Sequence, residues 1–425
     1  MTVAPATTAL RVRTRPLRLD GRLLDVLPGD GGELSWVRGD DGVVGWGEVA
    51  RFTASGPERF ADADRWWRGV VDRLDAASSH DDVRLPGTGA LAFASFTFSD
   101  DGPGSVLVVP RVIVGRRGHR AWVTEITPAD VPAARTPLPV PSPVRPGGRL
   151  SYADGDVPAH RYRVAVAAAV ERMRAGQLDK AVLAHDLLAH ADDPLDPRFL
   201  LRGLARRYPT CWSYAVDGLV GATPELLLRL RGRTVESRVL AGTMWPGSGP
   251  AADGPGTDAD TATALIASAK DRREHAYAVD SLAASLRPLV AELHVPDAPS
   301  VLTLPNVSHL ASDVHARLDP ARPASLLTLI GAVHPTAAVG GTPTADATAL
   351  IAEIEGLDRG RYAGPVGWID ADGAGEMGIA LRCAELHGRT ARLFAGCGIV
   401  ADSDPDAEVR EAAAKMRAVR EALEG

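Results

Sequence analysis

The chain has 425 residues, of which 45% are hydrophobic, so it is long enough to bury a large core as one or two domains. Its formal net charge is −7 and it contains no block of five basic residues, which argues against a nucleic-acid or acidic-membrane binder. A small-molecule ligand is therefore expected, with no nucleic acid and no membrane among the partners.

Cysteine usage and the N-terminus indicate the cellular compartment. Cys211, Cys383 and Cys397 lack CxxC spacing and are odd in number, so neither a disulfide framework nor a zinc site is expected. The first ten residues lack a basic segment followed by a long apolar core, and no run of 18 apolar residues occurs. These features predict a soluble protein of the cytoplasm.

Residues 10–125 are predicted to be rich in β-strands. Short alternating runs such as 105–109 are separated by glycine and aspartate, and one helix near 58–77 interrupts them. The prolines between Pro128 and Gly148 cannot occupy a central strand or a helix interior, so they mark an exposed connector.

We therefore expect an N-terminal lobe over 1–148 and a second region over 149–425. In the second region Gly176 ends the first helix, and Pro288 interrupts or kinks a much longer one. The expected segments are a helix over 160–175, strands over 178–188, 212–216, 225–230 and 234–239, a loop over 247–260 and a helix over 258–293.

The C-terminal part of the chain brings an arginine, glycines, two glutamates and a lysine close together in sequence. Alternation through 378–384 predicts a strand on which Arg382 shares its face with small residues only. A second apolar run, 391–400, is expected to break at Gly396 and Gly398, where backbone N–H groups can approach a ligand without a Cβ between them.

A helix is predicted to begin at Pro405, with Glu408, Glu411 and Lys415 on one flank of its apolar stripe. One interpretation is a solvated edge with an ion pair between Glu411 and Lys415. The other is an anion site beside a metal site, in which Arg382 and Lys415 hold carboxylates and the glutamates hold a cation. The helix by itself leaves both open.

Two charged side chains occupy unexpected strand positions. Lys180 falls on the same face as Val182 and Ala184, so it either points into a cavity as a candidate general base or lies on an exposed strand face. Glu225 follows Pro224 at the start of a strand, where it is either an ordinary exposed strand end or a buried general acid with a raised pKa.

The long helix carries carboxylates on its apolar stripe. Asp271 lies in phase with inward-facing residues, and Glu274 follows it. Buried carboxylates need a partner, which is either magnesium or the basic neighbours such as Lys270. His275 is expected to be a hydrogen-bonding core residue rather than a metal ligand.

Two glycine-containing turns complete the candidates. Gly242 stands beside the hydroxyl residue Thr243, and the segment 334–341 ends in a glycine pair. Both turns permit close approach of the backbone to a ligand, although such patterns are common in turns generally.

Taken in chain order, these segments resemble the chorismate-utilising enzymes, and within that family the isochorismate synthases. The resemblance is strong from Val157 to the C-terminus and looser at 45–51. The matching segments are Lys180–Ala184, Ala222–Glu225, Leu240–Thr243, Lys270–His275, His334–Thr336, Arg382–Ala384, Gly396–Gly398 and Glu408–Glu411.

The resemblance implies an α/β (α+β) fold of two stacked, mainly antiparallel sheets flanked by helices, to which the N-terminal lobe contributes strands. It also implies magnesium-dependent conversion of chorismate to isochorismate, by addition of water at C2 and loss of the C4 hydroxyl. Lys180 would activate the water and Glu225 would protonate the departing hydroxyl.

Further residue roles are implied by the same resemblance. Glu274 and Glu411 would bind magnesium, with Asp271 and Glu408 holding metal-bound waters. The substrate contacts would come from Gly242, Thr243, His334, Ala338, Tyr362, Arg382, Gly396, Gly398 and Lys415.

The same positions separate the subfamilies. Ammonia-using relatives carry glutamine in place of Lys180, and some carry lysine in place of Ala241, so this chain resembles the water-using members. Salicylate synthases have a threonine in the segment that corresponds to the one around Ala338 here. The alanine at position 338 therefore favours an enzyme that stops at isochorismate. A salicylate synthase and a non-catalytic chorismate-binding subunit remain the alternatives.

His185, Ala269, Cys397 and Ala412 depart from the family pattern, and altered packing around the site is expected from them. The resemblance further implies a monomer that needs no glutaminase subunit. Its product would feed menaquinone or siderophore biosynthesis.

Overall fold

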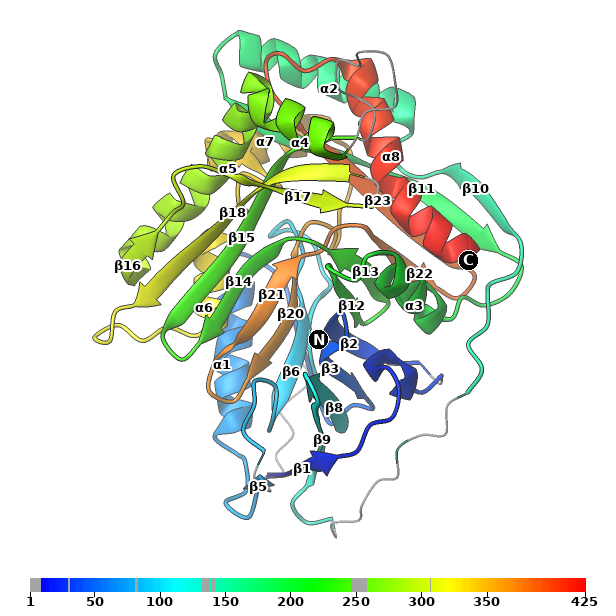
Figure 1. Ribbon diagram of the computed structural model, residues 1–425, viewed down its shortest axis with the longest axis vertical. Coiled ribbons are helices and arrows are strands. Elements are labelled where there is room, and N and C mark those ends of the chain that lie inside the picture. Colours follow the sequence, from blue (N-terminus) through cyan, green and yellow to red (C-terminus); the bar gives the residue numbers. More distant parts are fainter. Residues whose placement is uncertain are drawn as a thin grey trace.

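The computed structural model describes residues 9–29, 31–80, 83–131, 138, 142–245, 258–305 and 307–425. These residues form two large sheets and the helices that flank them, as Figure 1 shows. Every strand pair is antiparallel except that of β1 with β5. The predicted α/β fold of two mainly antiparallel sheets is confirmed.

The larger sheet contains 13 strands. Its order is β10 (Leu150–Asp154), β11 (Lys180–Ala191), β23 (Thr390–Ile399), β22 (Cys383–His387), β13 (Leu219–Thr223), β12 (Trp212–Val216), β2 (Leu34–Arg38), β3 (Asp41–Trp46), β8 (Val112–Arg117), β9 (Arg120–Pro128), β1 (Leu10–Leu17) and β5 (Ser79–His80), with β19 (Gly341–Thr342) beside β11.

The smaller sheet contains 10 strands. Its order is β16 (Val290–His294), β18 (Val307–Leu318), β15 (Thr234–Met244), β14 (Leu226–Arg231), β21 (Gly375–Ile379), β20 (Pro365–Asp370), β6 (Leu91–Ser95), β7 (Ser105–Val109) and β4 (Ala50–Ala54), with β17 (Ser300–Leu304) beside β18. N-terminal strands extend both sheets, because β2 pairs with β12 and β6 pairs with β20. The domain boundary at residue 148 stays a prediction.

The helices pack against particular strands. Helices α2 and α8 contact β11 and β23, and α5 and α6 contact β15 and β14. Their bounds are α1 (Arg59–Val71), α2 (Ala159–Arg174), α3 (Pro197–Arg207), α4 (Asp258–Ala267), α5 (Ala269–Leu286), α6 (Leu326–Val333), α7 (Thr344–Ile354) and α8 (Pro405–Glu424), with 3-10 turns at Leu23–Val26 and Arg287–Leu289. Within the described ranges, no helix combines the length and apolarity that a membrane crossing requires.

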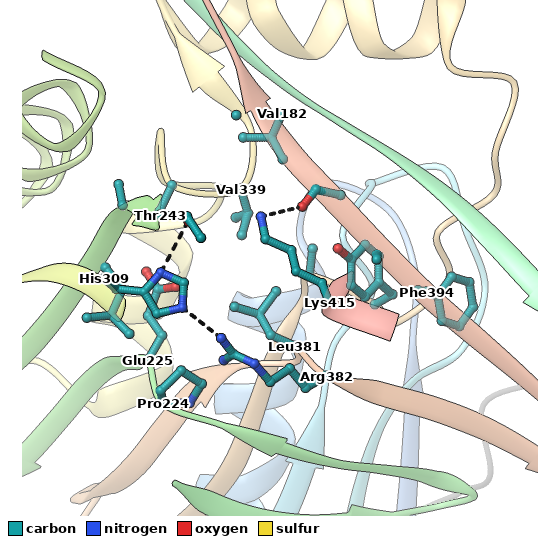
Figure 2. A pocket seen from close by; sticks show the side chains of 18 of the residues that line it. Val182, Pro224, Glu225, Thr243, His309, Val339, Leu381, Arg382, Phe394 and Lys415 are labelled. Atoms are coloured by element: carbon teal, nitrogen blue, oxygen red, sulfur yellow. Dashed lines mark hydrogen bonds between the residues drawn. The ribbon is translucent and has the colours of Figure 1, made fainter. Parts of the chain in front are cut away.

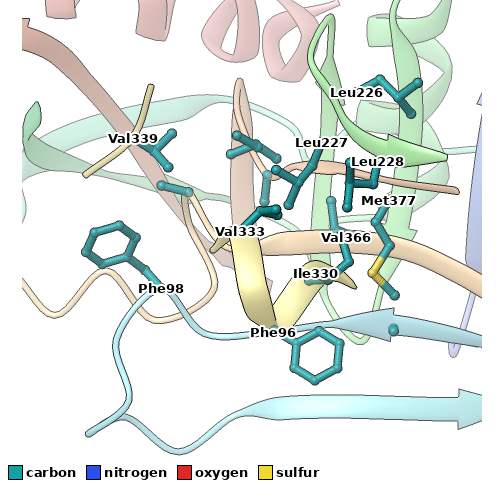
Figure 3. Packing of buried hydrophobic residues seen from close by; sticks show 14 of the residues in the cluster. Phe96, Phe98, Leu226, Leu227, Leu228, Ile330, Val333, Val339, Val366 and Met377 are labelled. Atoms are coloured by element: carbon teal, nitrogen blue, oxygen red, sulfur yellow. The ribbon is translucent and has the colours of Figure 1, made fainter. Parts of the chain in front are cut away.

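One continuous hydrophobic cluster joins the sheets and helices. It includes Leu183 of β11 and Leu228 of β14, which belong to different sheets. Figure 3 shows Ile330 and Val333 of α6 beside Val366 of β20 and the leucines of β14. Burial on this scale gives the strand ends a rigid frame, because interiors pack as densely as organic crystals.

Several predicted elements are confirmed. Helix α2 ends at Arg174, before Gly176, whose φ of +74° is the left-handed conformation that favours glycine at a helix end. Helix α8 begins at Pro405, where the side chain of Asp404 accepts a hydrogen bond from the N–H of Ala407. The strands expected at 212–216 and 105–109 are β12 and β7.

The predicted helix over 258–293 is wrong as a single element, although its predicted interruption near Pro288 is confirmed, because α5 ends at Leu286. Ser268 separates α4 from α5 and accepts a hydrogen bond from the N–H of Asp271. After Pro288 the chain forms the strand β16 rather than a further helical turn. The cap and the proline together outcompete the helical periodicity of the segment.

The strand predicted over 378–384 is also wrong, because β21 ends at Ile379 and β22 begins at Cys383. Arg382 lies between them with a φ of +48°, a left-handed conformation, so it shares no strand face with small residues. The break expected at Gly396 and Gly398 does not occur either. Both glycines continue β23, opposite Ala184 and Val182 of β11.

Parts of two further predictions fall outside the described residues. The loop expected over 247–260 lies outside them up to residue 257, and its last residues begin α4. Of the proline-rich connector, residues 132–137 and 139–141 lie outside the description.

Candidate active site

A cavity between the C-terminal strands and the start of β14 collects most of the predicted site residues. It contains about 750 Å³ of empty space, a volume that includes its open mouth. Of the predicted residues, those that line it are Glu225, Thr243, Glu274, Ala338, Tyr362, Arg382, Gly396, Gly398 and Lys415.

Glu225 is a buried carboxyl group on the cavity wall. Glu225 is 4% exposed, and burial raises its pKa to about 8. The N–H of Leu240 and the positive charges of Lys180 and Arg382 act in the opposite direction but are outweighed by burial. The backbone N–H of Glu225 donates to Thr223 Oγ1 at 3.2 Å, which fixes the turn that precedes β14. Glu225 is therefore protonated at neutral pH and able to donate a proton.

Lys180 is fully buried and lies behind the cavity lining. Its Nζ atom is 3.2 Å from Glu274 Oε1, although the geometry of this ion pair does not satisfy a hydrogen bond. Glu274 itself lines the cavity. The exposed-strand interpretation of Lys180 is therefore wrong, and its ammonium group is separated from the cavity by Glu274 and Gly398.

Gly398 makes this arrangement possible. A Cβ atom at Gly398 would overlap Glu274 Oε1 and would lie 2.9 Å from Lys180 Cε. Because a side chain at this position would displace Glu274 or Lys180, the glycine of β23 provides the space in which the carboxylate of α5 meets the lysine of β11.

Arg382 and His309 form a buried pair on another side of the cavity. Arg382 Nη2 lies 2.7 Å from His309 Nε2, and His309 Nδ1 lies 3.3 Å from the carbonyl of Gly242 and 3.2 Å from Thr243 Oγ1. Figure 2 shows the imidazole ring between Thr243 and Arg382. Burial lowers the pKa of His309 far below its usual value, and the positive charges of Arg382 and Lys415 lower it further, so the ring is neutral.

Lys415 and Tyr362 complete the polar lining. Lys415 Nζ donates to the carbonyl of Gly396 at 2.9 Å and pairs with Glu411 Oε1 at 2.8 Å. Tyr362 stacks on Phe394, with ring centroids 5.2 Å apart, and burial raises the pKa of its hydroxyl above the usual value. With Arg382, the site thus offers two cations and a neutral hydroxyl.

Asp271 and Gly242 support the cavity from behind. Strand β15 bulges between Ala241 and Thr243, and Gly242 adopts a φ of +75° there. The N–H of Thr243 donates to Asp271 Oδ1 at 3.2 Å, and the Ser268 hydroxyl donates to the other oxygen. Both carboxylate oxygens of Asp271 are thus engaged, which favours helix capping over a metal role.

Carboxylates converge beside Lys415. Ligand atoms of Cys397, Glu408 and Glu411 lie within 4.8 Å of one another, and Glu408 pairs with Lys270 at 3.2 Å. Burial, followed by the charge of Glu411, raises the pKa of Glu408. Burial raises the pKa of the Cys397 thiol well above its usual value, so Cys397 is not available as a thiolate ligand. The oxygen-rich set fits a hard cation.

His334 does not reach the cavity, contrary to the prediction that it binds substrate. Its Nε2 atom lies 3.1 Å from the carbonyl of Phe98, to which it donates, and its ring packs edge-on against Phe60 and Phe98. Burial lowers the pKa of His334 to about 3. The histidine therefore joins the N-terminal lobe to the end of α6.

His275 follows its prediction as a core residue. Its ring nitrogens lie 2.8 Å from Ser312 Oγ and 3.3 Å from the Ala241 carbonyl. The sequence reasoning missed His309, which lies in the strand β18. The same face of this strand also carries Asp313 and His315, so one more polar residue gave no distinctive signal.

Comparison with known proteins assigns the family. Residues 143–424 match the family model described as "Chorismate binding enzyme". The chain belongs to this family of chorismate-binding enzymes.

Individual members of the chorismate-binding family resemble the chain over most of its length. A Mycobacterium tuberculosis protein provisionally named isochorismate synthase MenF is 37% identical over 370 residues, which are 84% of this chain and 92% of that protein. Isochorismate synthase DhbC of Bacillus subtilis is 39% identical over 62% of this chain and 67% of its own length.

A solved structure of the family agrees with the fold. The crystal structure of DhbC from Bacillus anthracis, provisionally assigned as a 2,3-dihydroxybenzoate-specific isochorismate synthase, superposes with a TM-score of 0.76 at 29% identity. The superposition covers 95% of this chain and 98% of that one. The N-terminal strands are therefore part of the shared fold.

Proposed function

We propose that this chorismate-binding enzyme is an isochorismate synthase, which converts chorismate to isochorismate. The observation that carries the proposal is Glu225, a buried acid with a pKa of about 8 that lines one cavity together with Arg382 and Lys415. An acid that stays protonated at neutral pH suits expulsion of a hydroxyl group, and two cations suit the two carboxylates of chorismate. The names of the relatives support the same activity.

The reaction exchanges one water for another. Lys180 must first lose its ammonium proton, because only the neutral amine can act as a base. Water then bonds to C2 of chorismate while the Lys180 amine accepts its proton, the double bonds shift, and the C4–O bond breaks as Glu225 donates its proton. Arg382, Lys415 and the tyrosine Tyr362 orient the substrate carboxylates, and β23 presents Gly396 and Gly398 beside them. Since a buried ion pair joins Lys180 to Glu274, we infer that the pair rearranges before Lys180 acts.

We also propose that magnesium is the cofactor. Glu274 and Glu411 would bind it and Glu408 would hold metal-bound water. Glu274 lines the cavity, Glu408 and Glu411 lie close together in a cluster beside Lys415, and carboxylate oxygens suit a hard cation. Bound magnesium would neutralise the ring carboxylate of chorismate and fix the ring between acid and base.

The decisive experiment incubates the purified protein with chorismate and magnesium and separates the products by chromatography. We expect isochorismate alone, because Ala338 places no hydroxyl on the cavity wall. Salicylate with pyruvate would identify a salicylate synthase instead. Chorismate binding without any product would identify a non-catalytic chorismate-binding subunit.

We further propose a cytoplasmic monomer that works without a glutaminase subunit. The three cysteines are free and buried, which suits a reducing compartment. Light scattering after size-exclusion chromatography tests the monomer. Growth of a deletion strain with added menaquinone or siderophore distinguishes the two pathways that the product would supply.

A further inference from the structure

The edge of β11 beside the cavity is completed by side chains instead of a strand. Strand β19 pairs with β11 only at Lys180 and Ala181, and β10 begins to pair only at Leu187. Between these points, the N–H of Val182 donates to the carbonyl of Gly340 at 2.8 Å. The Val182 carbonyl and the Ala184 N–H bind an ion pair of two side chains.

That ion pair consists of Arg359 and Glu355, both fully buried side chains. Arg359 Nη2 donates to the Val182 carbonyl at 2.6 Å, and Nη1 donates to the Val339 carbonyl at 3.0 Å. Nε and Nη2 each lie 2.6 Å from a carboxylate oxygen of Glu355. Glu355 Oε2 in turn accepts from the N–H of Ala184 at 2.8 Å.

The segments that this pair connects are adjacent parts of the cavity wall. Val182 and Val339 both line the cavity, and Val182 lies two residues after Lys180 on the same strand. Figure 2 shows the side chains of Val182 and Val339 near each other in the site. One planar guanidinium therefore links β11 to the loop that follows α6, in addition to the backbone hydrogen bond from Val182 to Gly340.

We propose that Arg359, held by Glu355, is a positioning residue of the active site, one that sets the placement of Lys180 and of the apolar wall formed by Val182 and Val339. Only the expected effect on kcat rests on the proposed function; the structural role of Arg359 does not. Arg359 touches neither the cavity nor the reacting groups, so it acts through the backbone carbonyls that it binds.

The guanidinium also connects the wall to the N-terminal lobe. Its carbon lies 4.1 Å from the ring centroid of Phe98, and the N–H of Phe98 donates to the carbonyl of Gly360 at 2.9 Å. A lysine cannot reproduce these contacts, because its ammonium is a point donor without the fork that reaches two carbonyls and a carboxylate together.

Arg359→Lys tests the proposal against a matched control, Arg198→Lys. Arg198 is a similarly buried guanidinium that binds Asp196 and Ser142 away from the cavity. A second variant combines Arg359→Met with Glu355→Gln. It leaves no unpaired buried charge, keeps an acceptor for the Ala184 N–H and removes the donors to Val182 and Val339.

Two measurements on the full chain decide the outcome. We expect both Arg359 variants to lower kcat for chorismate by about ten- to a hundred-fold with a smaller change in KM, because displaced catalytic groups cost rate. Hydrogen exchange should accelerate in 180–185 and 336–342 while β7 keeps its protection. Arg198→Lys should change neither kcat nor the hydrogen exchange of these two segments.

Unchanged exchange in both segments, or a loss of kcat no larger than that of Arg198→Lys, would overturn the proposal. If the unmodified protein does not convert chorismate, the proposed function fails. The exchange measurement then still decides whether Arg359 holds the two walls together.

Discussion

The neutral imidazole of His309 accepts a hydrogen bond from Arg382, with 2.7 Å between Nε2 and Nη2. Its Nδ1 atom faces the carbonyl of Gly242, so the proton of the ring lies on Nδ1 and Nε2 is free to accept. Arg382 has a left-handed backbone conformation between two strands, and the histidine holds its side chain in the cavity.

Replacing His309 by leucine should impair substrate binding. Arg382 would lose a buried acceptor, and hydrogen bonds to charged groups are worth about 1.5–3 kcal/mol. We expect KM for chorismate to rise by roughly ten-fold or more, with a smaller effect on kcat. Steady-state kinetics measures both constants. An unchanged KM with intact folding would mean that Arg382 is positioned without the histidine.

Glu225→Gln should greatly slow turnover while preserving the fold, because an amide is not acidic enough to transfer a proton to the C4 hydroxyl. General acids contribute about 10²–10⁴-fold, so kcat should fall by at least two orders of magnitude. In the unmodified enzyme, kcat/KM should decline as pH rises through about 8, where Glu225 loses its proton. A rate that is flat from pH 6 to pH 9.5 would contradict this role.

Glu225 should also make stability depend on pH. Its folded pKa of about 8 lies above the ordinary value of 4.5, so the protonated form is favoured by folding. The contribution of Glu225 to the free energy of unfolding is therefore fully present below pH 4.5 and is lost as pH rises to about 8. The loss is at most about 1.4 kcal/mol per pH unit. Glu225→Gln should flatten that part of the curve in denaturant titrations. An identical pH dependence in the variant would argue that Glu225 is not buried as an acid.

Gly398→Ala should damage the site more than the fold. The added methyl group overlaps Glu274 Oε1 and crowds Lys180, so the ion pair between them must shift. We expect kcat to fall by about a hundred-fold. Gly69→Ala is the matched control, because its nearest neighbour is the flexible end of Arg73 at 3.7 Å. Equal activity of the two variants would show that the close approach has no catalytic importance.

Lys180→Ala should keep the fold and lose turnover. The substitution removes the proposed base and leaves Glu274, which is 14% exposed, with access to water. Circular dichroism and thermal melting check the fold, and isochorismate formation checks activity. Near-normal turnover in the folded variant would remove Lys180 from the mechanism.

Magnesium should be required for activity. Chelation should stop turnover, and added magnesium should restore it. Glu274→Gln and Glu411→Gln should each raise the half-saturating magnesium concentration by about ten-fold or more, since a carboxylate ligand is lost. Glu353→Gln, which changes an exposed ion pair with Arg172, is the control. Full activity in chelator, or equal magnesium dependence in all three variants, would exclude these ligands.

Local sequence signals predicted the helices well where a cap or a stop accompanied the periodicity. Asp404 and Pro405 start α8, and Gly176 follows the end of α2. They failed at Arg382, where the alternating pattern continues but the chain turns. There the Tyr214 hydroxyl donates to the Leu381 carbonyl, and the Arg382 carbonyl accepts from Ala222. Both partners come from strands far away in sequence.

The sequence by itself determined which residue types are present and, through their order, the family and most of the elements. Only the tertiary structure decided that Glu225 is buried, that Lys180 meets Glu274, that His334 lies outside the cavity and that Arg359 connects its walls. The physical reason is the distance along the chain over which each interaction acts. Capping and periodicity act within a few residues, whereas desolvation, ion pairing and the walls of a cavity arise from segments that meet only after the sheets have formed.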